Sequence, residues 1–291
     1  MKKLSVSLIA CLFFVFANAQ PSIIVTPQWL NERLNDPDIV ILQTGFLKMD
    51  YEKEHIKDAR FLWPGWLAFD SPEGSFNPPE PKAASKVLQD LGVNKNSKII
   101  LVHNFADVSA TARMFLQLEY LGLKGQVFYL NGGLTAWKKA GYPVTTEVPI
   151  VKKGNFNAGT INPVLVDRNY VLQALQNKSS EIVDARAKRF YDGDPTGNPR
   201  DGHITGALNL TYTDMIDSTN AIKPESELAK NFVAVLPNKE KEVVTYCFIG
   251  QTASVIYLTG RMLGYNVKLY DGSMQEWSRM PELPMEKTKK E

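Results

Sequence analysis

The 291-residue sequence contains only two cysteines, Cys11 and Cys247. Cys11 lies in an N-terminal apolar segment that we expect to be removed, which leaves Cys247 as the single thiol of the mature chain. One thiol cannot form a disulfide within the chain, so no internal disulfide is expected. A free cysteine is often a buried, inert side chain. Whether Cys247 is inert or reactive depends on its position in the sequence.

The sequence also lacks clustered positive charge. Its formal net charge is +2 at pH 7, and no long basic run precedes the lysine-rich last residues. Proteins that bind phosphate backbones need grouped Lys and Arg, so a nucleic-acid partner is not expected. No Gly-x-Gly-x-x-Gly sequence follows a predicted strand, which argues against a dinucleotide-binding enzyme.

The apolar run over residues 4–16 is shorter than a typical membrane-spanning helix. It follows the basic start Met1-Lys2-Lys3 and precedes the small-x-small site Ala17-Asn18-Ala19. This order predicts a signal peptide over residues 1–19, cleaved before Gln20. The protein is therefore expected to be exported, periplasmic or secreted, with no membrane attachment after cleavage. A lipoprotein signal ending at Cys11 is less favoured, because the apolar run continues beyond that residue.

The rest of the sequence consists of two similar halves. The corresponding segments are 51–59 and 200–207, 120–123 and 262–265, and 130–137 and 270–277. In each half, apolar runs typical of buried strands alternate with predicted helices, which implies a parallel sheet with helices on both faces. The sequence predicts an α/β protein of two tandem domains, 22–145 and 160–286, joined by a Pro- and Gly-containing linker.

Cys247 directly follows a predicted buried strand, 243–246, and precedes a short turn that leads into a predicted helix. Ligands bind at the carboxyl ends of strands in open parallel sheets. The turn's N–H groups, with a helix N-terminus behind them, would stabilise an anion such as a thiolate. The thiolate is the nucleophilic form of cysteine. The position of Cys247 therefore favours a reactive residue over an inert one.

Asp184 and Arg186 follow another predicted strand, 181–183, and should lie at the same edge of the sheet as Cys247. A purely structural ion pair is one interpretation. We favour separate roles, in which Asp184 organises the loops and Arg186 faces an anionic substrate. Arg189 and Arg200 are weaker candidates for contacts with that substrate.

Four segments occur in a fixed order: Val183-Asp184-Ala185-Arg186, Gly202-His203-Ile204-Thr205-Gly206-Ala207, Tyr246-Cys247 with its turn, and Asp271-Gly272-Ser273 with Trp277. Together they resemble a tandem-domain rhodanese, of the thiosulfate and 3-mercaptopyruvate sulfurtransferase family, over essentially the whole mature chain. The resemblance implies transfer of sulfane sulfur from a small donor such as thiosulfate to cyanide or a thiol, through a persulfide on Cys247. It places Arg186 at the substrate, and implies no metal or organic cofactor. The N–H groups that would hold the persulfide are those of Phe248, Ile249, Gly250, Gln251 and Thr252.

The first half departs from this pattern. Gln43-Thr44-Gly45 stands where the second half has Asp184-Ala185-Arg186, and counting back from the helix end at Leu121-Gly122 places Phe105 at the position of Cys247. Without a nucleophile or an arginine, this half is expected to be catalytically inactive. As in other tandem rhodaneses, it would pack against the active domain and form one wall of a cleft, a common location for ligand sites.

Other conspicuous side chains are expected to be structural. The Gly-His-Ile segment is mainly structural in the resembled family, which argues against His203 as a general base, and His55 and His103 are weaker candidates still. Trp137 and Trp277 are expected in the core. A second aromatic group is also expected in the core, with the cleft lining as the alternative; it comprises Phe61, Trp63, Trp66 and Phe69.

Two other functions are considered for the same fold. A cysteine phosphatase or arsenate reductase needs Arg at the sixth position after its Cys, and Ala253 stands there. A rhodanese-fold module that delivers sulfur to a protein acceptor, with little thiosulfate activity, agrees with a turn that has no basic side chain. The turn also lacks the small-residue pattern of 3-mercaptopyruvate enzymes, so the sequence leaves the physiological donor open.

Overall fold

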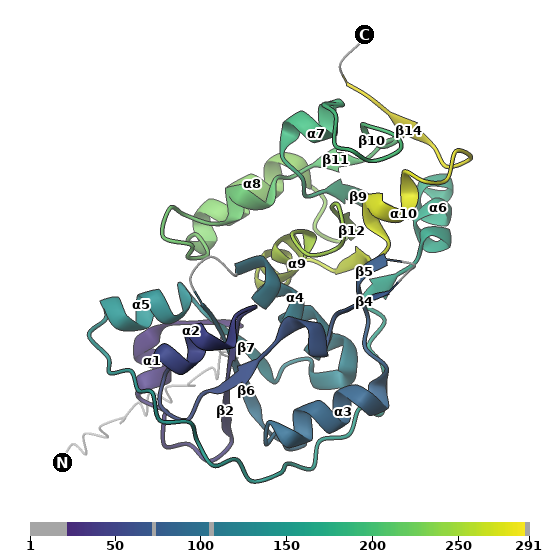
Figure 1. The fold of residues 1–291 in the computed structure, drawn as a ribbon. Helices are drawn as coiled ribbons and strands as arrows, with labels where there is room; N and C mark the ends of the chain where they lie inside the picture. Colours follow the sequence, from purple (N-terminus) through teal and green to yellow (C-terminus); the bar gives the residue numbers. More distant parts are fainter. Residues whose placement is uncertain (1–21, 72–73, 105–107, 289–291) are drawn as a thin grey trace, which may run out of the picture.

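The computed structural model describes residues 22–71, 74–104 and 108–288, and these form two domains of the same architecture (Figure 1). Each domain is built on a five-stranded parallel sheet. The strand order in the first is β1 (Ile24–Val25), β7 (Val127–Leu130), β6 (Lys98–His103), β2 (Ile39–Thr44), β3 (Arg60–Leu62). The equivalent order in the second is β8 (Leu165–Val166), β13 (Val267–Tyr270), β12 (Glu242–Tyr246), β9 (Ser180–Asp184), β11 (Leu208–Asn209). The predicted fold class is confirmed.

Helices connect the strands. Those of the first domain are α1 (Pro27–Asn31), α2 (Lys48–Lys53), α3 (Pro81–Asp90), α4 (Val108–Leu118), α5 (Gly133–Lys139) and the turns η1 (Pro64–Trp66) and η2 (Glu119–Leu123). Those of the second are α6 (Arg168–Asn177), α7 (Lys188–Asp192), α8 (Glu225–Val235), α9 (Ala253–Met262), α10 (Ser273–Trp277) and the turn η3 (Tyr212–Met215). Two small antiparallel pairs complete the fold: β4 (Phe69–Ser71) with β5 (Gly74–Asn77), and β10 (His203–Ile204) with β14 (Met285–Glu286).

Both faces of each sheet are buried, which explains the nearly continuous apolar runs of the central strands. Successive strand residues point to opposite faces. On β6, Ile99 and Leu101 pack in one core cluster with α3 and α4, whereas Ile100 and Val102 pack in another with α1 and α5. A strand covered by helices on both sides has no position that favours a polar residue, so its sequence does not alternate.

The internal duplication extends to individual contacts. His55 stacks on Tyr51, with Nδ1 2.7 Å from that residue's carbonyl, and His203 stacks on Tyr191 in the same way, also at 2.7 Å. Trp137 and Trp277 are fully buried, as predicted, and each indole N–H donates to a proline carbonyl. Equivalent residues therefore make the same hydrogen bonds and ring contacts in both domains.

The two domains meet mainly through α4 and α9, which lie side by side near the middle of the molecule (Figure 1). Aligning Leu121-Gly122 with Leu263-Gly264 makes Phe115 equivalent to Tyr257, and the two rings contact each other at 6.4 Å. By the same alignment Glu119 is equivalent to Arg261, and these side chains form an ion pair at 3.1 Å. The helices thus pack about a local pseudo-twofold axis in a shared apolar core.

Removing residues 22–159 is expected to destabilise what remains, because α9 loses the helix that covers it. Buried side chains of this interface include Phe115 and Tyr257, and exposing a side chain of that size costs about 1.5–3 kcal/mol. Domains are typically stable by only about 5–15 kcal/mol. Urea unfolding and light scattering of residues 160–288 would test this. A monomeric fragment with the stability and activity of the full chain would contradict it.

The prediction of a core position is wrong for three aromatic residues. Trp63, Trp66 and Phe69 are each more than 40% exposed, whereas Phe61 is half-buried against the core. Trp66 is the last residue of the short η1 turn after β3, and Trp63 directly precedes this turn. The two rings contact each other edge to face at 6.4 Å instead of entering the core.

No helix in the described part of the chain is long and apolar enough to cross a bilayer. The predicted signal peptide lies outside the described residues.

Candidate active site

Cys247 lies at the carboxyl edge of the second sheet, directly after β12. Tyr246, the last residue of β12, pairs with Asp184 on β9, so the residues that follow these strands lie at the same edge. The backbone of Cys247 is held on both sides. Its N–H donates to Ser273 Oγ at 3.3 Å, and its carbonyl accepts from the Met274 N–H at 3.1 Å. The residue is only 1% exposed, so the thiol has a fixed and nearly enclosed position.

The turn 248–252 has N–H groups with no acceptor in the part of the chain that the structure describes. Gly250 has a φ of +80°, in the left-handed region that favours glycine. The Phe248 carbonyl accepts from the Gln275 N–H at 2.9 Å, which fixes the turn against α10. Over the described ranges, no residue accepts a hydrogen bond from the N–H groups of 248–252. Unpaired N–H groups stabilise a nearby anion, which is the role that the sequence assigns to these residues.

Arg186 and Asp184 form a buried ion pair beside this turn. Arg186 Nη2 and Nε donate to the Asp184 carboxylate at 2.6 and 3.0 Å, and Nη2 also donates to the Gly202 carbonyl at 2.7 Å. Burial alone would lower the pKa of Arg186, but the hydrogen bonds and negative charge of Asp184 outweigh it and raise the pKa. The guanidinium lies 5.0 Å from the centre of the Phe248 ring.

The expected division of roles is therefore only partly visible. Asp184 does organise the loop, because it also accepts from the Arg186 N–H at 2.9 Å. Arg186 is 2% exposed and its charge is matched by Asp184, which leaves Nη1 as the group with no hydrogen-bond partner among the described residues. Any contact of Arg186 with a donor is thus limited to this one group.

Arg200 is not available to a substrate. Its guanidinium donates to the carbonyls of Trp277, Ser278, Met280 and Leu283, so it anchors the segment after α10. Arg189 lies over the Phe190 ring at 4.4 Å. The weak substrate role considered for Arg200 is wrong, because its donors are used in the fold.

His203 is placed as a structural residue. Nδ1 lies 2.7 Å from the Tyr191 carbonyl, Nε2 lies 3.3 Å from Glu286, and the ring stacks on Tyr191 at 3.6 Å. Both ring nitrogens therefore have partners within the fold, which agrees with a structural role.

The residue of the first domain that corresponds to Cys247 is His103, not Phe105. β6 pairs with β7 as β12 pairs with β13, and this register aligns His103 with Cys247. The count from the helix end was wrong because the connection after β6 is longer than the turn after β12. Phe105 itself lies outside the described residues. The same registers place Gln43 at the position of Asp184, as expected.

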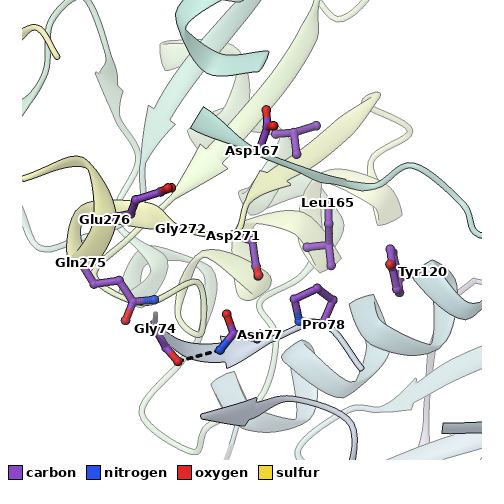
Figure 2. Close-up of a pocket in the computed structure, with 11 residues that line it drawn as sticks. Gly74, Asn77, Pro78, Tyr120, Leu165, Asp167, Asp271, Gly272, Gln275 and Glu276 are labelled. Carbon is purple, nitrogen blue, oxygen red and sulfur yellow. Dashed lines mark hydrogen bonds between the residues drawn. The ribbon is translucent and has the colours of Figure 1, made fainter. Parts of the chain in front are cut away.

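A cavity of about 370 Å³ lies between the domains (Figure 2). The first domain forms one wall with Gly74, Asn77, Pro78 and Tyr120; the second supplies Leu165, Val166, Asp167, Asp271, Gly272, Gln275 and Glu276. In the described part of the chain this lining includes three carboxylates but no Lys or Arg, and two of the carboxylates, Asp271 and Glu276, form ion pairs with Arg113 and Arg168. Cys247 does not line the cavity, although Gln275 joins the two sites through its hydrogen bond to Phe248.

Two residues near Cys247 were not singled out from the sequence. Ser273, within the Asp271-Gly272-Ser273 segment, accepts from the Cys247 N–H, and its place in a repeated motif could have indicated this. Arg113 contacts the turn from the other domain, and no local sequence pattern marks it.

The described residues contain no group of three or more His, Cys, Asp or Glu side chains arranged to hold a metal ion.

Comparison with known proteins places this site in context. A family model described as "Rhodanese-like domain" matches residues 26–140 and 167–280. A thiosulfate sulfurtransferase of Azotobacter vinelandii is 28% identical over 265 residues, which cover 91% of this chain and 97% of that protein. The sulfur carrier protein TtuD of Thermus thermophilus is 28% identical over 285 residues, covering 92% and 98%. The crystal structure of SseA from Escherichia coli, a 3-mercaptopyruvate sulfotransferase, has a TM-score of 0.76 at 28% identity, covering 87% of this chain and 99% of that one.

Proposed function

Because the chain belongs to the rhodanese family, we propose that it is a sulfurtransferase in which Cys247 holds the transferred sulfur as a persulfide. The observation that supports this most directly is the position of Cys247, at the carboxyl end of β12 and before a turn whose N–H groups have no acceptor among the described residues. A persulfide anion in that position would accept hydrogen bonds from these groups.

The proposed cycle has two steps. The Cys247 thiolate attacks the outer sulfur of thiosulfate, the S–S bond of thiosulfate breaks, and sulfite leaves with the bonding electron pair. A nucleophile such as cyanide or a thiolate then attacks the terminal sulfur of the Cys247 persulfide. The S–S bond of the persulfide breaks, thiocyanate or a new persulfide leaves, and the Cys247 thiolate is restored. No net oxidation or reduction of the protein occurs.

Thiosulfate as the donor is supported by groups that favour an anion, namely the N–H groups of the turn and Nη1 of Arg186. 3-Mercaptopyruvate is a second donor of the same kind. Its single carboxylate needs less positive charge than the dianion thiosulfate, and Asp184 already matches the charge of Arg186.

A second candidate function is delivery of sulfur to a protein acceptor with little use of thiosulfate. The turn favours it, because Phe248 and Ile249 are partly exposed at the site and the turn contains no basic side chain. Apolar groups at the entrance suit a protein or apolar thiol acceptor better than a free dianion.

The first test is the intact mass of the purified protein before and after thiosulfate or 3-mercaptopyruvate. We expect the wild type to gain the mass of one sulfur atom, which cyanide removes, and the donor with the faster gain to be the better substrate. The same spectra show whether residues 1–19 have been removed, which tests the proposed export through a signal peptide to the periplasm or medium. If no donor adds sulfur to Cys247, the proposed enzyme activity is wrong.

A further inference from the structure

Arg113, on α4 of the first domain, is a fully buried charge at the boundary with the catalytic domain. Nη2 donates to Asp271 Oδ1 and to the Phe76 carbonyl, both at 2.5 Å. Nη1 donates to the Gly250 carbonyl at 3.4 Å, within the turn that follows Cys247. One guanidinium therefore connects the β4–β5 hairpin, the end of β13 and the catalytic turn. Figure 2 shows Asp271 beside Asn77, the last residue of the hairpin, and Pro78, which follows it.

The position of Arg113 breaks the pseudo-symmetry of the interface. Aligning α4 with α9 through Phe115 and Tyr257 places Val255 at the position equivalent to Arg113, and Val255 is buried without any charge. An apolar residue thus suffices for packing at this position of the helix pair. The charged residue of α4, Arg113, lies on the face of this helix that contacts the turn 248–252, called here the catalytic turn.

Stability alone is a weak explanation for this charge. Taking an ion pair out of water costs about as much as the attraction returns, and well-packed apolar residues often stabilise such a position equally well. A buried guanidinium with several acceptors does, however, fix the relative positions of those acceptors, because its donors form a rigid planar fork.

The two contacts of the Gly250 carbonyl, with Arg113 and with Ser254, together determine how one N–H group is directed. In a trans peptide the C=O and the following N–H point in opposite directions. The Gly250 carbonyl faces Arg113 and also accepts from Ser254 Oγ at 2.9 Å. The Gln251 N–H of the same peptide therefore points away from Arg113, and it has no acceptor in the described part of the chain.

The contact is close enough to depend on glycine. A Cβ at Gly250 would lie 2.9 Å from Arg113 Nη1 and 3.3 Å from the Asp271 carbonyl. A second residue of α4, Ser109, accepts from the Gln251 side chain at 3.0 Å. Residues four apart lie on the same face of a helix, so Ser109 and Arg113 together present one face of α4 to this turn.

We propose that Arg113 is a positioning residue for the catalytic turn, and that the first domain thereby completes an active site that it does not itself contain. This inference rests on the proposed function, since it assigns the Gln251 N–H to the sulfur of Cys247. Arg113 touches no reacting atom. It holds the Gly250 peptide so that this N–H faces the thiolate or persulfide.

The test compares two matched substitutions in the full chain, Arg113→Lys and Arg261→Lys. Both replace an arginine of an inter-domain ion pair and keep its charge. An ammonium at residue 113 can retain Asp271 but cannot reach Gly250 as a second, separate donor. We expect Arg113→Lys to lower kcat for sulfur transfer by about tenfold with KM little changed, because a misdirected N–H no longer stabilises the reacting sulfur. Arg261→Lys should stay within about twofold of the wild type, because the partner of Arg261, Glu119, lies outside the turn that follows Cys247.

A second measurement does not depend on sulfur transfer. The rate at which iodoacetamide alkylates Cys247, assigned by peptide mass, should also fall about tenfold in Arg113→Lys and not in Arg261→Lys. Arg113→Met and Arg261→Met extend the comparison, and the lysine variants decide it if the methionine variants do not fold. Equal losses in both lysine variants, or wild-type rates in Arg113→Lys, would overturn the inference. A wild type that gains no sulfur would instead refute the proposed function, while the alkylation rates still decide the role of Arg113.

Discussion

Replacing Cys247 by serine is expected to lower sulfur transfer by at least about a thousandfold, because the variant has no thiolate to attack the donor. A hydroxyl is not ionised near neutral pH and cannot form the S–S bond of a persulfide. The fold should persist, since the backbone contacts of residue 247 with Ser273 and Met274 do not involve the sulfur. The free energy of unfolding should change by no more than about 1 kcal/mol, because unpaired N–H groups of the turn can donate to the new hydroxyl.

Two measurements on Cys247→Ser and Cys247→Ala separate chemistry from folding. Steady-state turnover with thiosulfate and cyanide should be lost in both variants, and the intact mass of neither should rise. Urea unfolding should show both near the wild type. Turnover of more than a few per cent of wild type in Cys247→Ser would exclude the persulfide mechanism, and a large loss of stability in both variants would show that the residue is mainly part of the core.

The sequence predicted the features that follow from short-range periodicity. Repeated segments such as 130–137 and 270–277 required two similar domains, and apolar runs between predicted helices required parallel sheets. Once the strands were assigned, the carboxyl ends of β9 and β12 had to share an edge, which brought Asp184 and Cys247 together. Each of these steps depends on local pattern and on general properties of parallel sheets.

Features that depend on tertiary distance could not be predicted in this way. Whether Arg186 faces solvent or pairs with Asp184 depends on how tightly the loops close over it, and Arg200 is occupied by a segment about 80 residues later in the chain. Trp63 and Trp66 are apolar, but the short turn that holds them lies at a sheet edge. Arg113 shows the limit most clearly, because its only carboxylate partner, within the described residues, belongs to the other domain.

Substituting Asp184 by alanine is expected to destabilise the protein by about 3–5 kcal/mol, the usual effect of removing one partner of a buried ion pair. Both side chains of the Asp184–Arg186 pair are at most 1% exposed, so Arg186 would keep an uncompensated charge out of water. Glu181 is a control on the same strand. It pairs with Lys241 at 2.8 Å with both side chains partly exposed, and Glu181→Ala should cost less than about 1 kcal/mol. Urea unfolding of both variants measures the difference.

The double variant Asp184→Val with Arg186→Met shows what else the pair does. Apolar residues closer in volume to the pair should recover most of the lost stability, since they remove both buried charges together. With folding preserved, the kinetics report on the loss of the whole pair, in which Nη1 of Arg186 is the group without a hydrogen-bond partner among the described residues. If Nη1 of Arg186 binds the donor, KM for thiosulfate should rise about tenfold or more, in line with the loss of a hydrogen bond to a charged group. An unchanged KM in a stable double variant would show that Arg186 only supports the loop, and that the N–H groups of the turn suffice to bind the donor.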